Sequence, residues 1–262
     1  MSNQAGHLFH EGKIAEAIEA ASVSVKQDQT DVARRVLLAE LLLFGDDWAR
    51  ADVVLDTASA ADPAAAVVIA EFRQLLRAAQ ARRQLVTDGR APEFVGGPTQ
   101  SQTCLLKGYA ALRAGDAVGA ARASEEAETG RPRVSGAGDG VPFDDFRDLD
   151  DLVGGTFEVL TTTGKYFWIP IERVESVSFH KPRRARDLLW RRCSMVVRDG
   201  PEGDVYLPAI YDNGLPAGDM LRLGRGTEWT QTMPVRGSGQ RVFLTGETGA
   251  PIHELADVQF GS

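Results

Sequence analysis

Apolar positions recur at three- and four-residue spacing along residues 1–132, where alanine and leucine are abundant. This spacing places apolar side chains on one face of an α-helix, so the whole segment is predicted to be helical. Three stretches share a glycine followed by small and then apolar residues, and they begin at Gly12, Gly45 and Gly115. We interpret each stretch as a helical hairpin, because glycine permits a tight turn and alanine permits close helix packing.

The distance between the first two stretches favours a repeat architecture. Gly12 and Gly45 are 33 residues apart, close to the tetratricopeptide period of roughly 34 residues. Residues 64–86 add one more amphipathic helix, and residues 92–100 are predicted to be a loop. The first half is therefore predicted to be a tetratricopeptide-like array, and a generic helical bundle is the alternative.

The pattern changes after residue 132. Residues 133–146 contain the pair Asp139-Gly140 between short apolar flanks, which predicts either a small hairpin or a flexible linker. Residues 146–155 form a short acidic segment, for which one or two helical turns are expected. From this point onward the chain is therefore expected to form shorter secondary-structure elements.

From residue 156 onward, short runs rich in β-branched and aromatic residues alternate with glycine-containing turns. Three pairs of runs predict three antiparallel hairpins, with turns around residues 161–165, 200–203 and 236–239. One short helix is expected at about residues 183–191, where two leucines fall on one face. The pattern indicates an antiparallel sheet or a partial barrel.

Together these patterns predict an α+β protein in three parts. A helical tetratricopeptide-like domain occupies residues 1–132, a hairpin or linker occupies residues 133–146, and a smaller β-rich domain occupies residues 147–262. A chain of 262 residues is long enough to bury the cores of two such domains.

Charge and cysteine content narrow the functional class. The formal net charge is −8, so the protein as a whole is not built to attract nucleic acid or an anionic membrane. The two cysteines, Cys104 and Cys193, lie in unrelated contexts and are expected to be reduced. The N-terminal residues do not form a signal peptide, and no apolar run reaches the roughly 20 residues of a membrane span. A cytoplasmic location is therefore expected.

No recognised catalytic motif stands out in the sequence. The four histidines are scattered, and His7 and His10 have no second pair of metal ligands that would complete a site. We therefore expect no enzymatic activity, no cofactor and no metal. Five aspartates lack the spacing of a calcium loop and are expected to form a solvated face or to lie at the start of a helix; these are Asp144, Asp145, Asp148, Asp150 and Asp151.

The stretch RRARDLLWRR, residues 183–192, holds five arginines and one acid. On a helix, Arg186 and Trp190 are four residues apart, so the guanidinium is expected to lie over the indole. The stretch can bind a polyanion, or it can pair with acids within the protein or on a protein partner. The acidic segment at residues 144–151 is the expected internal partner, and the net charge argues against nucleic acid.

Several segments resemble the ImpE/SciE family, also called TagJ, whose members are accessory components of bacterial type VI secretion systems. The resemblance is carried by PFDDFRDLDDLVG, GKYFWIPIERVESVSFHKPRRARDLLWRRC, DGPEGDVYLPAIY, LRLGRGTEW and RGSGQRVFL. It implies a non-enzymatic adaptor that binds the N-terminal helix of the small contractile-sheath subunit, TssB. It also implies a link to ClpV, the ATPase that disassembles the sheath.

A helical array can hold an amphipathic helix of a partner in its groove, and aromatic side chains dominate such contacts. Trp168 lies in an alternating run and is expected to be a core residue. The residues predicted to contact a partner are Trp48, Phe72, Arg186, Leu188, Trp190 and Arg191. The alternative function is polyanion or nucleic-acid binding through the basic segment at residues 181–192.

Overall fold

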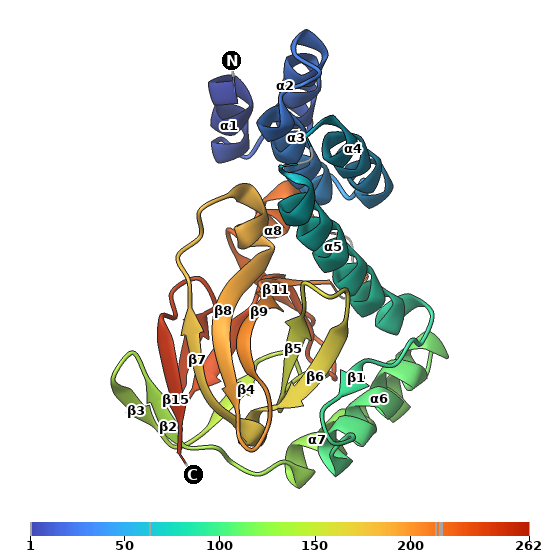
Figure 1. Cartoon of the computed structure of the whole chain (residues 1–262). Helices are drawn as coiled ribbons and strands as arrows, with labels where there is room; N and C mark the ends of the chain where they lie inside the picture. Colours follow the sequence, from blue (N-terminus) through green and yellow to red (C-terminus); the bar gives the residue numbers. More distant parts are fainter. Residues whose placement is uncertain (1, 63, 213, 215–216, 262) are drawn as a thin grey trace.

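The computed structural model describes residues 2–62, 64–212, 214 and 217–261. The first half is helical and the second half is rich in strands, so the predicted α+β class is confirmed (Figure 1). The helices are α1 (Ser2–His10), α2 (Ile14–Gln27), α3 (Val32–Phe44), α4 (Trp48–Ala61), α5 (Ala66–Thr87), α6 (Gln100–Arg113), α7 (Ala117–Gly130) and α8 (Asp219–Arg222).

Three helical hairpins form where the glycine pattern predicted them. Helix α1 packs on α2, α3 on α4 and α6 on α7. Gly12 and Gly115 take positive φ angles of 85° and 74° in their turns, but the α3–α4 turn places Asp46 at φ 63°. Gly45 serves a different purpose there, because a Cβ atom at this position would lie 2.6 Å from Ile18 Cδ1. Its role is to allow α2 and the α3–α4 turn to approach each other.

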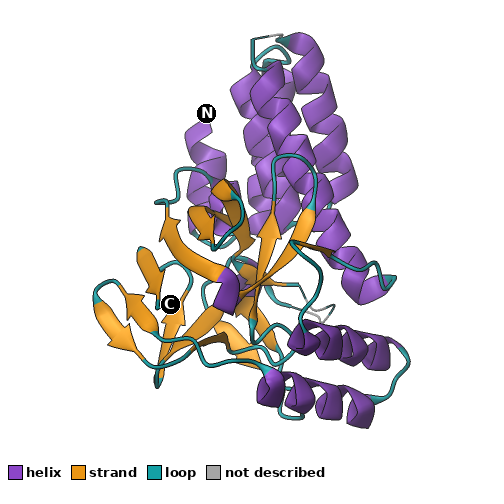
Figure 2. Ribbon diagram, turned by 60° about the horizontal axis from the view of Figure 1, so that its bottom comes forward, coloured by secondary structure: helices purple, strands orange, loops and turns teal. Residues whose placement is uncertain are grey.

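The helices fall into two groups (Figure 2). We call α1–α5 the helical array. It stands on one end of the strands, and the α6–α7 hairpin lies apart beside them. Between the two groups, residues 92–100 were predicted to be a loop, but Glu93–Phe94 form strand β1. This prediction was wrong because β1 is made by tertiary pairing with β6, which a local pattern does not reveal.

Strands make up most of the second half. They are β2 (Gly136–Gly138), β3 (Val141–Phe143), β4 (Phe146–Asp148), β5 (Thr156–Leu160), β6 (Tyr166–Pro170), β7 (Val174–Phe179), β8 (Trp190–Val197), β9 (Glu202–Pro208), β10 (Ile210–Tyr211), β11 (Thr227–Trp229), β12 (Gly237–Gln240), β13 (Val242–Thr245), β14 (Thr248–Pro251) and β15 (Asp257–Phe260). We call this strand-rich half the β region.

A nine-stranded sheet runs in the order β1-β6-β5-β9-β8-β7-β15-β2-β3, and two three-stranded sheets have the orders β10-β12-β11 and β14-β13-β4. Every pairing in the nine-stranded sheet is antiparallel except β1 with β6. The hairpin β5–β6 has the turn that the sequence predicted, and the β8–β9 hairpin forms with its turn at residues 198–201, two residues before the predicted position. The sheet is strongly curved around its core (Figure 1).

The third predicted hairpin was placed wrongly. Residues 236–239 were expected to be a turn, but Gly237–Gln240 form strand β12 between β10 and β11. The glycines are needed for close packing, since a Cβ atom on Gly237 would lie 2.4 Å from the Tyr211 ring and one on Gly239 would lie 2.2 Å from the Gly226 carbonyl oxygen.

The pair Asp139-Gly140 forms the turn of a small hairpin. Strands β2 and β3 pair on either side of it, and both turn residues have positive φ angles, 49° and 81°. These angles match the turn type that joins two-residue hairpins. The acidic segment that follows is strand β4 and a set of turns, so the expected helical turns are not formed there.

The array and the β region are joined by a shared hydrophobic cluster. One hydrophobic cluster extends from the helices to Trp168, Trp190 and Leu223, and a second lies within the β region. Trp168 is fully buried, as expected. The division at residues 132 and 146 remains a prediction about folding units. Among the residues that the structure describes, no helix is both long and apolar enough to cross a membrane.

Candidate functional site

The expected helix at residues 183–191 is not formed. A 3-10 turn covers Ala185–Leu188, and strand β8 begins at Trp190. A four-residue spacing therefore does not stack Arg186 on Trp190. The Arg186 guanidinium instead lies over the Phe72 ring of α5, 4.2 Å from its centroid. We call Ala185–Leu188 the arginine turn.

Trp190 is the centre of an aromatic cluster between the array and the β region. Its ring lies 6.2 Å from that of Trp48 and 6.3 Å from that of Phe72, both edge to face. Phe72 and Trp190 are buried, and Trp48 is half-buried. Edge-to-face pairs contribute about 0.5–1.5 kcal/mol each beyond the burial of their area. The cluster therefore helps hold the two halves together.

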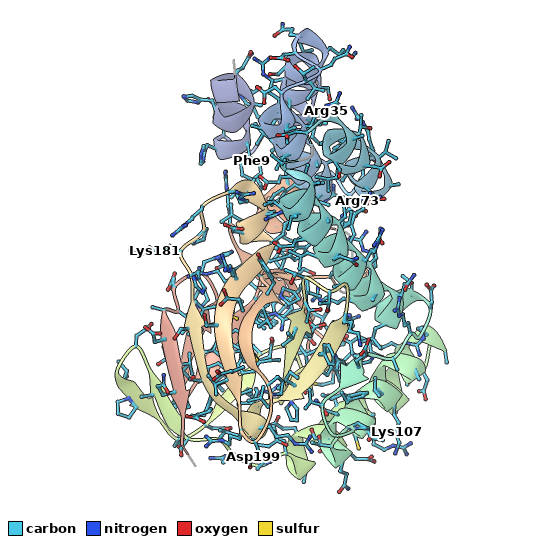
Figure 3. All side chains as sticks on the ribbon, in the orientation of Figure 1. Phe9, Arg35, Arg73, Lys107, Lys181 and Asp199 are labelled. Atoms are coloured by element: carbon cyan, nitrogen blue, oxygen red, sulfur yellow. The ribbon has the colours of Figure 1, made fainter. Side chains whose placement is uncertain are left out.

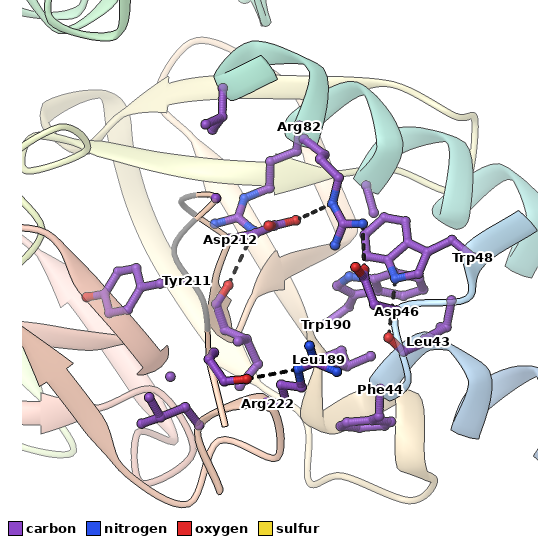
Figure 4. Close-up of a pocket in the computed structure, with 18 of the residues that line it drawn as sticks. Leu43, Phe44, Asp46, Trp48, Arg82, Leu189, Trp190, Tyr211, Asp212 and Arg222 are labelled. Carbon is purple, nitrogen blue, oxygen red and sulfur yellow. Dashed lines mark hydrogen bonds and ion pairs between the residues drawn. The ribbon is translucent and has the colours of Figure 1, made fainter. Parts of the chain in front are cut away.

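A cavity of about 430 Å³ lies beside this cluster (Figure 4). It is lined by α3, α4, α5, the start of β8 and residues after β9. Arg83 spans its mouth, because its guanidinium lies 3.8 Å from the Trp48 ring centroid and forms ion pairs with Asp46 at 2.7 Å and Asp212 at 2.8 Å. The cavity thus has apolar walls and a charged rim that joins the array to the β region.

A buried charge network underlies the cavity. Arg82 of α5 donates two hydrogen bonds of 2.9 Å to the carboxylate of Glu158 on β5. Glu158 also forms an ion pair with Arg241 and accepts a 2.5 Å hydrogen bond from the Tyr166 hydroxyl. Burial raises the pKa of Glu158, but Arg82 and Arg241 outweigh it and lower that pKa to about 2. The network anchors α5 to the sheet.

The second carboxylate of the network, Asp148, has a raised pKa, whereas the pKa of Glu158 is lowered. Asp148 is fully buried and pairs with Arg241 at 2.9 Å. Burial raises the pKa of Asp148 to about 6, because the charge of Arg241 only partly compensates for the loss of water. The one sign of this network in the sequence is the glutamate within the apolar run of β5.

The expectation of a solvated acidic face was wrong for two of the five aspartates. Asp148 and Asp150 are buried, and Asp150 accepts the backbone N–H groups of Leu152 and Gly237. The reason is that Asp150 stabilises a turn through these hydrogen bonds, and Asp148 pairs with the buried guanidinium of Arg241. Asp145 and Asp151 pair with other cations: Arg131 at 2.6 Å and Arg147 at 2.9 Å.

The internal acid that faces the basic stretch was also misassigned. Arg184 and Arg186 lie nearest to Glu40 of α3, each 3.9 Å from its Oε1 atom, and not to residues 144–151. Burial raises the pKa of Glu40 to about 7, against the attraction of the two arginines. Burial likewise lowers the pKa of Arg186.

The six predicted contact residues divide by location. Trp48, Phe72, Arg186 and Trp190 meet in the cluster, and Leu188 packs against the same core. Arg191 lies elsewhere: it is buried, and its guanidinium contacts His253 Nδ1 at 3.1 Å and the Leu255 carbonyl oxygen at 3.4 Å.

Four of the six predicted contact residues are buried. Phe72, Arg186, Trp190 and Arg191 are each less than 9% exposed, because they fill the junction between the two halves. Trp48 and Leu188 remain partly accessible. Whether any of the six contacts a partner stays a prediction.

His7 is exposed and lies 3.7 Å from Glu11. No three His, Cys, Asp or Glu side chains come together as metal ligands within the described ranges of the chain. Both cysteines are buried and free. Burial raises the pKa of the Cys193 thiol far above its usual value.

The chain is similar to known proteins both in sequence and in fold. The family described as ImpE protein matches residues 140–259. The chain is 28% identical over 258 residues to a type VI secretion system accessory component, TagJ, of Pseudomonas aeruginosa, covering 98% of this chain and 90% of that protein. The crystal structure of protein VPA1032 from Vibrio parahaemolyticus superposes with a TM-score of 0.92 at 27% identity, covering 99% of this chain and 98% of the other. The resemblance to the ImpE family is confirmed.

Proposed function

We propose, from the premise that residues 140–259 form an ImpE domain, that this protein is an accessory component of a type VI secretion system. The single observation that carries the proposal is the similarity to an accessory component along 98% of the chain. Because it extends through both the array and the β region, the similarity supports a role for the whole architecture.

We further propose that the protein acts as a non-enzymatic adaptor in the cytoplasm. Its partner is the N-terminal helix of the small sheath subunit, TssB, and through it the adaptor modulates sheath disassembly by ClpV. A helical array supports this proposal, because packed helices offer grooves for an amphipathic helix. The cavity beside Trp48 has apolar walls and a charged rim, which suits one apolar anchor of such a helix.

A capture experiment with purified proteins tests the proposal. The sheath small subunit should be retained by the full-length chain, and the same subunit without its first helix should not. Trp48→Ala should weaken capture at least tenfold if Trp48 lines the contact, since aromatic anchors contribute about 2 kcal/mol or more. Val118→Ala, at a fully exposed position on α7, is the matched control. Equal capture of the two forms of the subunit would contradict the proposed contact.

One observation favours polyanion binding as a second candidate. Lys181, Arg183 and Arg184 are exposed on the loop before the arginine turn, and Lys181 points into solvent (Figure 3). Of the other arginines of the stretch, Arg186 and Arg191 are buried, and Arg192 is exposed but paired with Asp204. A steep salt dependence of DNA binding that disappears in the double variant Arg183→Ala, Arg184→Ala would support this function.

A further inference from the structure

The chain covers the inner face of its own helical array. By inner face we mean the side of α1, α3 and α5 that contacts the β region. Arg225 donates to the carbonyl oxygens of Phe9 and His10 at the end of α1, at 3.0 and 2.7 Å. The arginine turn packs against α3, and Arg186 lies over Phe72 of α5. The inner face of the array is therefore covered by the protein itself.

The two charged side chains at the centre of this contact, Glu40 and Arg186, lack hydrogen bonds at several of their polar atoms. Glu40 is 3% exposed and Arg186 is 8% exposed, so both charges are largely removed from water. Their closest approach, 3.9 Å, is too long for a hydrogen bond. Glu40 Oε1 and the Nε and Nη1 atoms of Arg186 have no hydrogen-bond partner. Buried charges without such bonds oppose folding, so the contact is held less firmly than its burial suggests.

The arginine turn is attached firmly on one side only. At its C-terminal end, the carbonyl oxygen of Leu188, its last residue, lies 3.2 Å from His253 Nε2, and the carbonyl oxygen of the next residue, Leu189, accepts the Ala209 N–H at 2.8 Å. Before it, residues 180–184 form an exposed loop. The Asp187 carboxylate accepts the N–H groups of Arg183 and Arg184, which shapes the turn but ties it to nothing else.

We propose that the arginine turn is a releasable latch across the inner face of the array, and that the charge on Glu40 controls its release. In the closed state Arg186 rests on Phe72 and Glu40 is shielded from water. In the open state the turn swings into solvent while Leu189 keeps its bond to the β region. Release uncovers Phe72 and the edge of the aromatic cluster.

The direction of control follows from the groups that surround Glu40. Arg184, Arg186, Asp187 and the backbone N–H of Ala185 act on it, all from the turn or its flank, and Tyr206 of β9 acts on Arg186. Burial dominates and raises the pKa of Glu40 from its ordinary 4.5 to about 7. The closed state therefore binds a proton more tightly than the open state, and rising pH favours release.

Hydrogen exchange of the full chain measures the latch without any partner. The reporters are the amides of Asp187 and Leu189, which donate to the Arg184 and Arg186 carbonyl oxygens within the turn. Between pH 6 and pH 8, after correction for the intrinsic rate, their exchange should accelerate about tenfold, because ionised Glu40 favours the open state. Amides of β5 should not change.

Three variants make the test decisive. Glu40→Gln should abolish the acceleration, and Glu71→Gln, an exposed carboxylate on α5, should leave it as in the wild type. Arg186→Met retains an apolar contact with Phe72 but removes a cation beside Glu40, so it should shift the acceleration to higher pH. Equal acceleration in Glu40→Gln and the wild type, or none in the wild type, would overturn the latch. Neither result depends on the proposed partner.

Discussion

Replacing Glu158 with glutamine tests whether the buried charge network holds the helical array to the sheet. The substitution preserves the shape of the side chain but removes its charge. Arg82 then loses the carboxylate to which it donates and Arg241 keeps only Asp148, while both guanidinium groups are at most 9% exposed. The new amide group also points N–H donors toward guanidinium groups that are themselves donors.

The stability lost in Glu158→Gln can be estimated in two ways, which agree. Removing one partner of a buried ion pair costs about 3–5 kcal/mol. Independently, the pKa of Glu158 is lowered from 4.5 to about 2, and at about 1.36 kcal/mol per pH unit this difference amounts to about 3 kcal/mol. Because the folded-state pKa is depressed, this stabilisation is present above pH 4.5 and is lost as pH falls through about 2.

Urea unfolding at neutral pH, followed by tryptophan fluorescence, measures the effect. Trp168 donates a 2.6 Å hydrogen bond to the Tyr166 hydroxyl of the network, so its emission should report the transition. The free energy of unfolding of Glu158→Gln should fall by about 3 kcal/mol, which lowers the midpoint by about 1 M or more. Glu175→Gln, an exposed carboxylate on β7, is the control and should change stability by less than about 0.5 kcal/mol.

A loss below about 1 kcal/mol in Glu158→Gln would refute this reasoning. Such a result would mean that the network costs as much in desolvation as it returns in attraction. Helix α5 would then be held to the β region mainly by apolar packing, through side chains such as Leu75 and Leu76.

Three other outcomes are expected. Glu40→Gln should stabilise the protein by up to about 3 kcal/mol at pH 8 and by little at pH 4.5, because a raised folded-state pKa of about 7 gives stability that is lost as pH rises; identical urea curves at pH 8 would contradict this. Gly239→Ala should destabilise by more than about 1 kcal/mol, since its φ is 94° and a Cβ atom would lie 2.2 Å from a carbonyl oxygen; an unchanged melting temperature would be inconsistent with strain. Asp47→Ala should cost about 1 kcal/mol by removing the N-cap of α4, measurable by urea unfolding.

The conformation of the basic stretch, residues 183–192, could not be predicted from local sequence patterns. Its five arginines and two leucines suggested one amphipathic helix, but the strand partner β9 draws Trp190 and Arg191 into a sheet. Arg186 is then free to reach Phe72, more than a hundred residues earlier in the chain. Which arginines remain in solvent depends on these long-range contacts.

The sequence by itself determined the helical first half and the strand-rich second half, and it offered the hairpin at Asp139-Gly140 as one of two alternatives. Each follows from interactions between near neighbours: a three-to-four or two-residue apolar period, and a dipeptide that tolerates positive φ. Only the tertiary structure decided that Glu158 and Glu40 are buried, that Gly237–Gln240 is a strand, and that the inner face of the array is covered by the β region. These outcomes depend on which distant groups meet, and desolvation and charge pairing act only once they do.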